Sequence, residues 1–190
     1  MPVVYFKRYR MCIELDRVDL DSPSMRYSVP NDVMFIPWSD RLVGQHASAK
    51  WESFRNEIDA IVFPCLGDKE GCRQLMRDLA QRNNFVLEAT WLAVVAKNGV
   101  PDIPAGTIQG LRLDNLEGAI QNVGVVPRFR GRGIGKSLLV KALCGFRDSG
   151  CKRVNLEVTI HNVGAVRLYE SIGFQYKETV FKVGNVPVTT

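Results

Sequence analysis

The chain has 190 residues, of which 46% are hydrophobic, and it carries a formal net charge of +5. This length and composition fit one domain with a full hydrophobic core. The sequence has no run of about 18 apolar residues, so we expect neither a membrane span nor a membrane partner. The basic stretch Met1–Arg10 lacks the apolar segment of a signal peptide, and five scattered cysteines favour reduced thiols over disulfides or a zinc site, so we expect a cytoplasmic protein without a metal.

The N-terminal half begins with a segment whose partner the pattern leaves open. Val3–Leu15 alternates apolar and basic residues, as a strand does. It pairs either with a sheet edge or with a second copy of the chain, and the second alternative would make a homodimer. Further expected elements are a loop at Asp16–Asn31, a strand at Val33–Pro37, a helix at Asp40–Ile58, a loop at Ala60–Asp68 and a helix at Lys69–Arg82 with Asp68 as its N-cap.

The second half predicts three antiparallel strands followed by a crossover. The strands are expected at Thr90–Lys97, Gly106–Leu113 and Gly118–Val126, joined by turns at Asn98-Gly99 and Asp114-Asn115 that are too short for helices. A helix at Gly133–Ser149 then leads to a strand at Val154–Val158, which should lie parallel to the third strand. Last come a helix at Val163–Ser171, capped by Asn162 and ended by Gly173, and one or two strands over Phe174–Val183. This order predicts an α/β (α+β) fold with a mixed, mostly antiparallel sheet flanked by helices.

Positive charge is concentrated in one part of the chain. Between Arg128 and Arg153 there are eight Lys and Arg residues against one Asp, a net charge of +7, so the remainder carries about −2. Such a concentration suits a small polyanionic ligand. A nucleic-acid track would extend over several elements with interleaved aromatic residues, so we expect no nucleic-acid partner.

The stretch Asn122–Ser137 contains a strand, a basic glycine-rich loop and the start of a helix. The helix begins without Ser, Thr, Asp or Asn at its cap, which leaves its first backbone N–H groups for an external anion. A P-loop would need glycine where Arg130 stands, and the spacing Gly131-x-Gly133-x-Gly135 differs from the dinucleotide fingerprint. A glycine-rich turn without any ligand is the remaining alternative.

Two motifs in this region resemble those of the GCN5-related N-acetyltransferases (GNAT). Arg130-Gly131-Arg132-Gly133-Ile134-Gly135 is similar to the family's R/Q-x-x-G-x-G/A motif. Asn155-Leu156-Glu157-Val158, followed by Asn162-x-x-Ala165-x-x-Leu168-Tyr169-Glu170-x-x-Gly173-Phe174, resembles its second motif. The resemblance implies a sheet splayed between core strands 4 and 5. It also implies one acetyltransferase domain over residues 1–190, with a core at 33–183 and an N-terminal extension at 1–32.

The resemblance implies acetyl-CoA as co-substrate, with no metal. The loop and helix start would bind the pyrophosphate, and the fourth core strand would hydrogen-bond the pantetheine. The residues implied are Val123, Val125, Arg130, Gly131, Arg132, Gly133, Ile134, Gly135, Lys136, Ser137 and Asn162. The local charge of +7 then faces a ligand that carries a pyrophosphate and a 3′-phosphate.

Tyr169 and Glu157 are the candidate catalytic residues. Tyr169 resembles the family's tyrosine that faces the coenzyme sulfur and would act as the acid, although its apolar stripe also fits an ordinary core position. Glu157 would act as the base, against the alternative of a solvated strand residue. Many family members have a glutamate where this chain has Gln121, which cannot accept a proton, and Glu117 is a weaker candidate.

The expected function is direct transfer of acetyl from acetyl-CoA to an amine, in a ternary complex. The amine acceptor is either a small molecule or a protein N-terminus, and the sequence carries no signature that selects one. A first alternative, prompted by Gln121, is a catalytically weak acetyl-CoA-binding regulatory domain. A second alternative is a phosphate-binding nucleotide protein.

Overall fold

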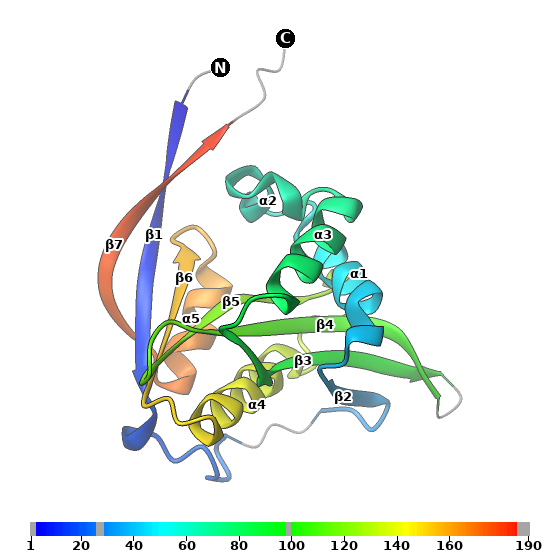
Figure 1. The fold of residues 1–190 in the computed structure, drawn as a ribbon, viewed down its shortest axis with the longest axis horizontal. Coiled ribbons are helices and arrows are strands. Elements are labelled where there is room, and N and C mark those ends of the chain that lie inside the picture. Colours follow the sequence, from blue (N-terminus) through cyan, green and yellow to red (C-terminus); the bar gives the residue numbers. More distant parts are fainter. Residues whose placement is uncertain (1–2, 26–28, 98–99, 186–190) are drawn as a thin grey trace.

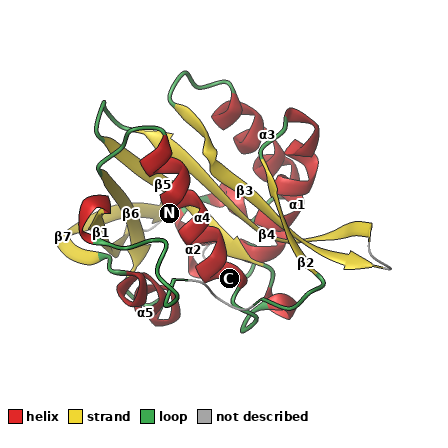
Figure 2. Ribbon diagram, turned by 90° about the horizontal axis from the view of Figure 1, so that it is seen from below, coloured by secondary structure: helices red, strands yellow, loops and turns green. Residues whose placement is uncertain are grey.

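One seven-stranded sheet runs through the molecule, and helices cover both of its faces (Figures 1 and 2). The computed structural model describes residues 3–25, 29–97 and 100–185. In sheet order the strands are β2 (Val33–Pro37), β3 (Phe85–Lys97), β4 (Val100–Arg112), β5 (Glu117–Val125), β6 (Arg153–Thr159), β1 (Val3–Glu14) and β7 (Gln175–Asn185). The helices are α1 (Val43–Phe54), α2 (Ile58–Val62), α3 (Lys69–Ala80), α4 (Ile134–Asp148) and α5 (Val163–Ile172). The predicted fold class is confirmed.

The predicted antiparallel meander of the second half is present as β3, β4 and β5. The turn at Asp114-Asn115 closes with a hydrogen bond from Leu113 N to Glu117 O of 2.8 Å, and the Asp114 carboxylate accepts two further backbone N–H groups. The predicted turn at Asn98-Gly99 lies outside the described residues. After β5 the chain crosses through α4 to β6, which runs parallel to β5 as expected.

The long helix expected at Asp40–Ile58 is wrong at both ends. A 3-10 turn occupies Asp40–Leu42, and α1 ends at Phe54. Glu57 adopts an extended conformation, with φ −101° and ψ 159°, which breaks the helix, and α2 then begins at Ile58 and extends into the predicted loop. The break has a tertiary cause, because α2 carries Asp59 to a buried arginine on β1. The expected α3 is confirmed, with the Asp68 carboxylate capping Gly71 N at 2.6 Å.

The N-terminal segment is an internal strand of the sheet. β1 pairs antiparallel with β6 on one side and with β7 on the other. Met11 and Ile13 are each 1% exposed and belong to the main hydrophobic core. The expected strand at Val3–Leu15 is therefore confirmed, and within this chain its partners are two strands from the C-terminal part. The final segment forms the single edge strand β7.

The main core lies between the sheet and α4, and glycines on two strands make room for the Phe146 ring. A Cβ atom at Gly110 or Gly118 would approach the Phe146 ring of α4 to 2.7 and 2.5 Å. A smaller core lies under α1 and α3 on the opposite face. No helix in the described part of the chain is long and apolar enough to cross a membrane.

The sheet opens between β5 and β6, as predicted. In the described chain these strands pair over just three residues each, Glu117–Ala119 with Arg153–Asn155. Beyond Ala119 the two strands diverge, while β5 remains paired with β4 on its other side. The divergence leaves one side of β5 free for other contacts.

Candidate active site

Two cavities of similar size lie along the split between β5 and β6. The first, of about 670 Å³, lies over Val123–Val125 of β5, the glycine-rich loop and the start of α5, and we call it the glycine-loop cavity. The second, of about 640 Å³, lies over Ala119–Asn122 of β5 and Asn155–Glu157 of β6, and we call it the Glu157 cavity. One strand therefore contributes successive residues to both cavities.

The start of α4 offers free backbone N–H groups to the glycine-loop cavity. Gly131 and Gly133 both have φ +76°, a left-handed conformation that glycine adopts without steric cost. No described side chain caps α4 at Gly133, as the sequence predicted. Because the amides of Ile134 and Gly135 belong to the first turn, they have no acceptor within the helix. This geometry suits an anion.

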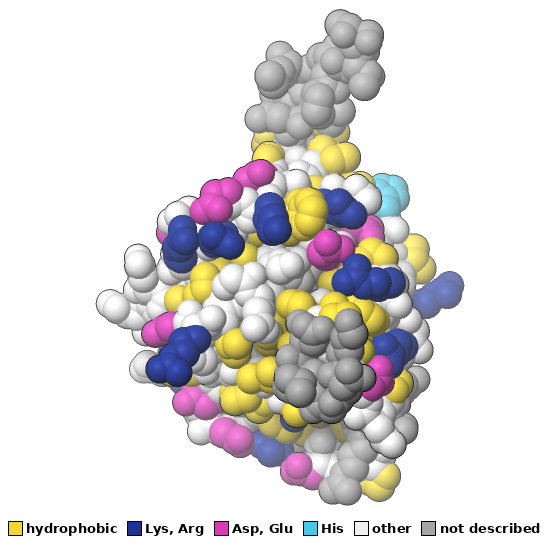
Figure 3. Space-filling model, turned by 90° about the vertical axis from the view of Figure 1, so that its right-hand side faces the viewer, with side chains coloured by type: hydrophobic (Ala, Val, Ile, Leu, Met, Phe, Trp, Pro, Cys, Tyr) yellow, Lys and Arg dark blue, Asp and Glu magenta, His cyan; other side chains and the backbone are white. Residues whose placement is uncertain are grey.

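The arginines around the loop are largely engaged with other parts of the protein. The Arg130 guanidinium donates to Val125 O at 3.0 Å and to Ser53 O at 3.1 Å, and it pairs with Glu57 at 2.8 Å. Arg132 pairs with Asp32 at 2.6 Å. On the face seen in Figure 3, basic and acidic side chains are likewise interspersed. The local charge of +7 is thus partly balanced by carboxylates from elsewhere in the chain.

Most of the predicted cofactor-binding residues line the glycine-loop cavity. Arg132 and Ser137 do not. The residues that do are Val123, Val125, Arg130, Gly131, Gly133, Ile134, Gly135, Lys136 and Asn162. Asn162 also caps α5, since its side-chain oxygen accepts from Ala165 N at 3.2 Å.

The free side of β5 presents backbone groups to the split. Val126 N donates to Ala105 O on β4 at 2.9 Å. Because successive residues of a strand point their hydrogen-bonding groups to opposite sides, Val125 and Val123 direct theirs away from β4 and toward the split. An extended ligand could pair with β5 there as an added strand does.

Tyr169 lies on α5 and lines the glycine-loop cavity. The side chain is 7% exposed and packs edge-on against Phe174. Its hydroxyl has no hydrogen-bond partner among the residues that the structure describes. Burial raises the pKa of Tyr169, and the nearby Asp59 carboxylate raises it further. The hydroxyl therefore stays protonated at neutral pH and is free to donate to a ligand.

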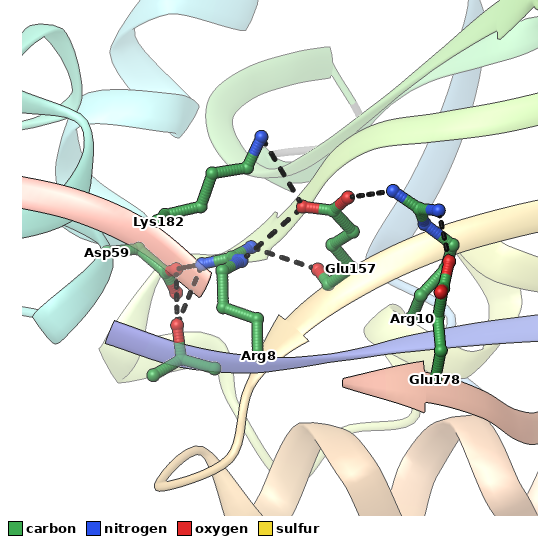
Figure 4. A network of polar contacts seen from close by, with 7 residues as sticks. Arg8, Arg10, Asp59, Glu157, Glu178 and Lys182 are labelled. Atoms are coloured by element: carbon green, nitrogen blue, oxygen red, sulfur yellow. Dashed lines mark hydrogen bonds and ion pairs between the residues drawn. The ribbon is translucent and has the colours of Figure 1, made fainter. Parts of the chain in front are cut away.

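Glu157 faces the second cavity, as expected, but cations already surround its carboxylate (Figure 4). Arg10 lies 3.1 Å from one oxygen, and Arg8 and Lys182 lie 3.8 and 3.9 Å from the other. Arg10 also pairs with Glu178. Arg8 and Lys182 lie beyond hydrogen-bond distance of the carboxylate, which therefore keeps acceptor sites for an incoming group.

Glu117, the weaker base candidate, and Gln121 also line the Glu157 cavity. Glu117 pairs with Arg153 at 2.7 Å, and Gln121 is exposed. Among the aromatic residues of α1 and of the segment that follows it, Phe63 lines this cavity, whereas Phe54 lines the glycine-loop cavity. Trp51 lines neither and stacks instead with Arg55, whose guanidinium lies 4.5 Å from the ring.

A buried ion pair joins the two cavities. Arg8 lines the Glu157 cavity, Asp59 lines the glycine-loop cavity, and the two side chains meet at 2.8 Å. The Arg8 guanidinium also donates to Thr159 Oγ1 at 2.7 Å and to Glu157 O at 3.0 Å (Figure 4). Sequence analysis missed both members of the pair, because Arg8 looked like any basic residue of an alternating strand.

A buried polar chain behind β5 was also missed. Lys50 is 0% exposed, and its ammonium donates to Gln109 Oε1 at 2.5 Å and to Asn122 Oδ1 at 2.8 Å. The Gln109 amide donates to Thr107 Oγ1, which in turn is 2.7 Å from His46 Nδ1. Burial lowers the pKa of Lys50 to about 7 and that of His46 to about 3.

Comparisons with known proteins agree with this geometry. Residues 51–174 match the family model described as "Acetyltransferase (GNAT) family". A mycothiol acetyltransferase of Parafrankia sp. is 37% identical over 97 residues, which are 51% of this chain and 30% of that protein. N-alpha-acetyltransferase 30 of Saccharomyces cerevisiae is 34% identical over 100 residues, 50% of this chain and 56% of that protein. The chain thus spans between 30% and 56% of the length of these two curated relatives.

Solved structures share the fold. A GCN5-related N-acetyltransferase from Sphaerobacter thermophilus aligns with a TM-score of 0.65 and 24% identity, over 96% of this chain and 51% of that one. An aminoglycoside N-acetyltransferase in complex with CoA aligns with a TM-score of 0.60 and 14% identity, over 81% and 93% of the two chains. At these identities the likeness shows the arrangement of strands and helices.

Proposed function

Because the chain belongs to the acetyltransferase (GNAT) family, we propose that it transfers an acetyl group from acetyl-CoA to an amine by direct attack in a ternary complex. The observation that carries this proposal is the pair of cavities that share β5 and meet at Arg8 and Asp59. A donor in one cavity and an acceptor in the other would approach each other through the split between β5 and β6.

The donor belongs in the glycine-loop cavity. The amides of Ile134 and Gly135 in the first turn of α4 receive the pyrophosphate, and the positive end of the α4 dipole favours its charge by about 0.3–2 kcal/mol. Val123 and Val125 bond the pantetheine as an added strand. This path leads the thioester along β5 toward Tyr169, which lines the same cavity.

The chemistry needs a neutral amine, a polarised carbonyl and a stabilised leaving group. The amine nitrogen forms a bond to the thioester carbon, and the bond from that carbon to sulfur breaks. The backbone N–H of Val125 faces the split and supports the developing oxyanion. The Tyr169 hydroxyl donates its proton to the departing thiolate.

The acceptor belongs in the Glu157 cavity, with Glu157 as the base. A lysine-like amine with a pKa of about 10.4 is only ~0.04% neutral at pH 7, whereas an α-amine near 7.8 is more than ~10% neutral. The demand on Glu157 therefore depends on the amine. The name of the Saccharomyces cerevisiae relative, an N-alpha-acetyltransferase, motivates including a peptide α-amine among the acceptors to be tested.

Release of free thiol from acetyl-CoA, measured against a panel of amines, tests the proposal. We expect turnover with at least one amine and thermal stabilisation by CoA. Stabilisation by CoA without turnover on any amine would favour an acetyl-CoA-binding domain, a function that Gln121 and the ion-paired Glu157 carboxylate also fit. Stabilisation by ATP in place of CoA would contradict both.

A further inference from the structure

Lys50 is a buried lysine without a carboxylate partner in the described part of the chain. Lysines are almost never fully buried unless an acidic group pairs with them, because desolvation penalises the charge. Here the ammonium is held by two carboxamide oxygens, from Gln109 on β4 and Asn122 on β5. Such a costly arrangement invites a functional explanation, and one of its two partners lies at the proposed acceptor site.

That partner is Asn122, which lines the Glu157 cavity. An ammonium has donors and no acceptor, so it can hold the carboxamide by its oxygen alone. The bond from Lys50 Nζ to Asn122 Oδ1 is 2.8 Å long. The Asn122 amide nitrogen has no acceptor among the described residues. Lys50 thereby keeps the oxygen inward and leaves the N–H₂ group for a ligand in the cavity.

We propose that Lys50 is a positioning residue that selects the acceptor, by presenting the Asn122 N–H₂ group to an oxygen atom of the amine substrate. The acceptor class is then an amine that carries a carbonyl oxygen near its nitrogen. The lining of the same cavity also includes the apolar residues Phe63, Leu66 and Ile120, which suit an aliphatic or aromatic substituent. This inference rests on the proposed function, because it assigns the Glu157 cavity to the acceptor.

Near neutral pH, Lys50 is the group of this cluster whose charge changes. The groups that act on it are His46, one turn earlier on α1, Cys72 on α3 and Cys65 before α3. Burial keeps His46 neutral by lowering its pKa to about 3, and it keeps Cys72 neutral by raising its pKa to about 11. A neutral Lys50 amine has a lone pair, so it can accept a hydrogen bond from the carboxamide N–H₂ as well as donate one to the carboxamide oxygen. Loss of the Lys50 proton therefore allows the Asn122 carboxamide to flip, with its nitrogen and oxygen exchanging places.

A matched pair of acceptors tests the selection. Leucinamide and 3-methylbutylamine share the amine and the isobutyl group, and the second lacks the carbonyl. We expect the ratio of their kcat/KM values to fall on the order of threefold to tenfold in Asn122→Ala and in Lys50→Met, the range of one hydrogen bond. The KM for acetyl-CoA should not change. The two amines differ in pKa, but this difference affects the ratio equally in wild type and in each variant, so it cancels when the ratios are compared.

The double variant and a control identify the route of the effect. If Lys50 acts through Asn122, the double variant that combines Lys50→Met with Asn122→Ala lowers the kcat/KM ratio no more than Asn122→Ala alone does. Lys69→Met, a lysine on the surface, should leave the ratio unchanged. An unchanged ratio in Lys50→Met, or additive losses in the double variant, would overturn the proposal.

A second measurement does not depend on turnover. The side-chain amide resonances of Asn122 in an NMR spectrum, assigned by their loss in Asn122→Ala, should titrate with a midpoint near pH 7 in wild type and stay constant in Lys50→Met. Cys65→Ser should titrate as wild type does, which removes that thiol as the cause. Resonances that do not move in wild type would refute the coupling, whereas an absence of acetyl transfer alone would refute the proposed function.

Discussion

Tyr169 presents an unpaired hydroxyl to the glycine-loop cavity, so its removal should affect chemistry more than folding. We expect Tyr169→Phe to lower kcat by about 10²-fold, with little change in thermal stability or in the KM for acetyl-CoA. Tyr176→Phe is the matched control, because Tyr176 is exposed and its hydroxyl forms a hydrogen bond with the Thr179 hydroxyl, outside both cavities. An unchanged kcat in Tyr169→Phe would show that Tyr169 is an ordinary core residue.

Burial also sets a pH limit for Tyr169. Because its pKa is raised above the ordinary value, the hydroxyl should not lose its proton below about pH 10. The alkaline limb of the wild-type pH–rate profile should therefore not report this residue.

Glu157 can be tested by comparing amines of different basicity. If it accepts the proton of the amine, Glu157→Gln should lower kcat/KM more for an alkylamine than for an α-amine, since the α-amine is already partly neutral at pH 7. Equal losses for both amines would mean that Glu157 serves to hold Arg8, Arg10 and Lys182 in place. Steady-state kinetics at pH 7 with both acceptors measures the difference.

His46 should make the protein sensitive to acid. Its folded-state pKa of about 3 lies below the ordinary 6.5, so between these values the unfolded chain binds more protons, and stability falls as pH falls through this window. The slope from this group is at most about 1.4 kcal/mol per pH unit. Urea unfolding at pH 7 and pH 5 should show a smaller loss for His46→Gln than for wild type. His161→Gln, at an exposed histidine, should retain the full loss.

At the scale of elements, α4 is held close to β3 by a glycine. A Cβ atom at Gly145 would lie 1.9 Å from Glu88 O, in the irregular part of β3 between Val86 and Trp91. Gly145→Ala should therefore cost about 3 kcal/mol of unfolding free energy, because neither backbone can yield without moving its element. Gly44→Ala on α1, where no described atom lies within 4 Å of the new methyl group, should stabilise by about 0.4–1 kcal/mol. Urea midpoints at constant m-value compare the two, and equal effects would contradict this packing.

At the scale of the whole molecule, the N-terminal strand β1 pairs with two strands from the C-terminal part of the chain. It lies between β6 and β7 and contributes Arg8 and Arg10 to the Glu157 cavity. We expect the Met11–Ile13 amides to exchange with solvent only on global unfolding, since they are buried inside the sheet. Hydrogen exchange monitored by NMR checks this. Protection well below the global stability would indicate a loosely attached arm.

The sequence itself determined the parts of the site that depend on neighbours along the chain. The glycine loop, the uncapped start of α4 and the Asn162 cap of α5 are each defined by a few consecutive residues, so local spacing carries the information. The same holds for Asp68 at α3 and for the crossover that makes β6 parallel to β5. The motifs that these local signals form carry the resemblance to the GNAT family, and that resemblance predicted the donor side and the split in the sheet.

Only the tertiary structure revealed the long-range contacts around the Glu157 cavity, which is the proposed acceptor site. Arg8 meets Asp59 across 51 residues and Thr159 across 151, and Lys50 reaches Asn122 across 72. No period or cap encodes such contacts, because they depend on which strands become neighbours and on where α1 breaks. The energetic reason is burial: charges placed inside the sheet must find partners there, and the fold determines which groups are within reach.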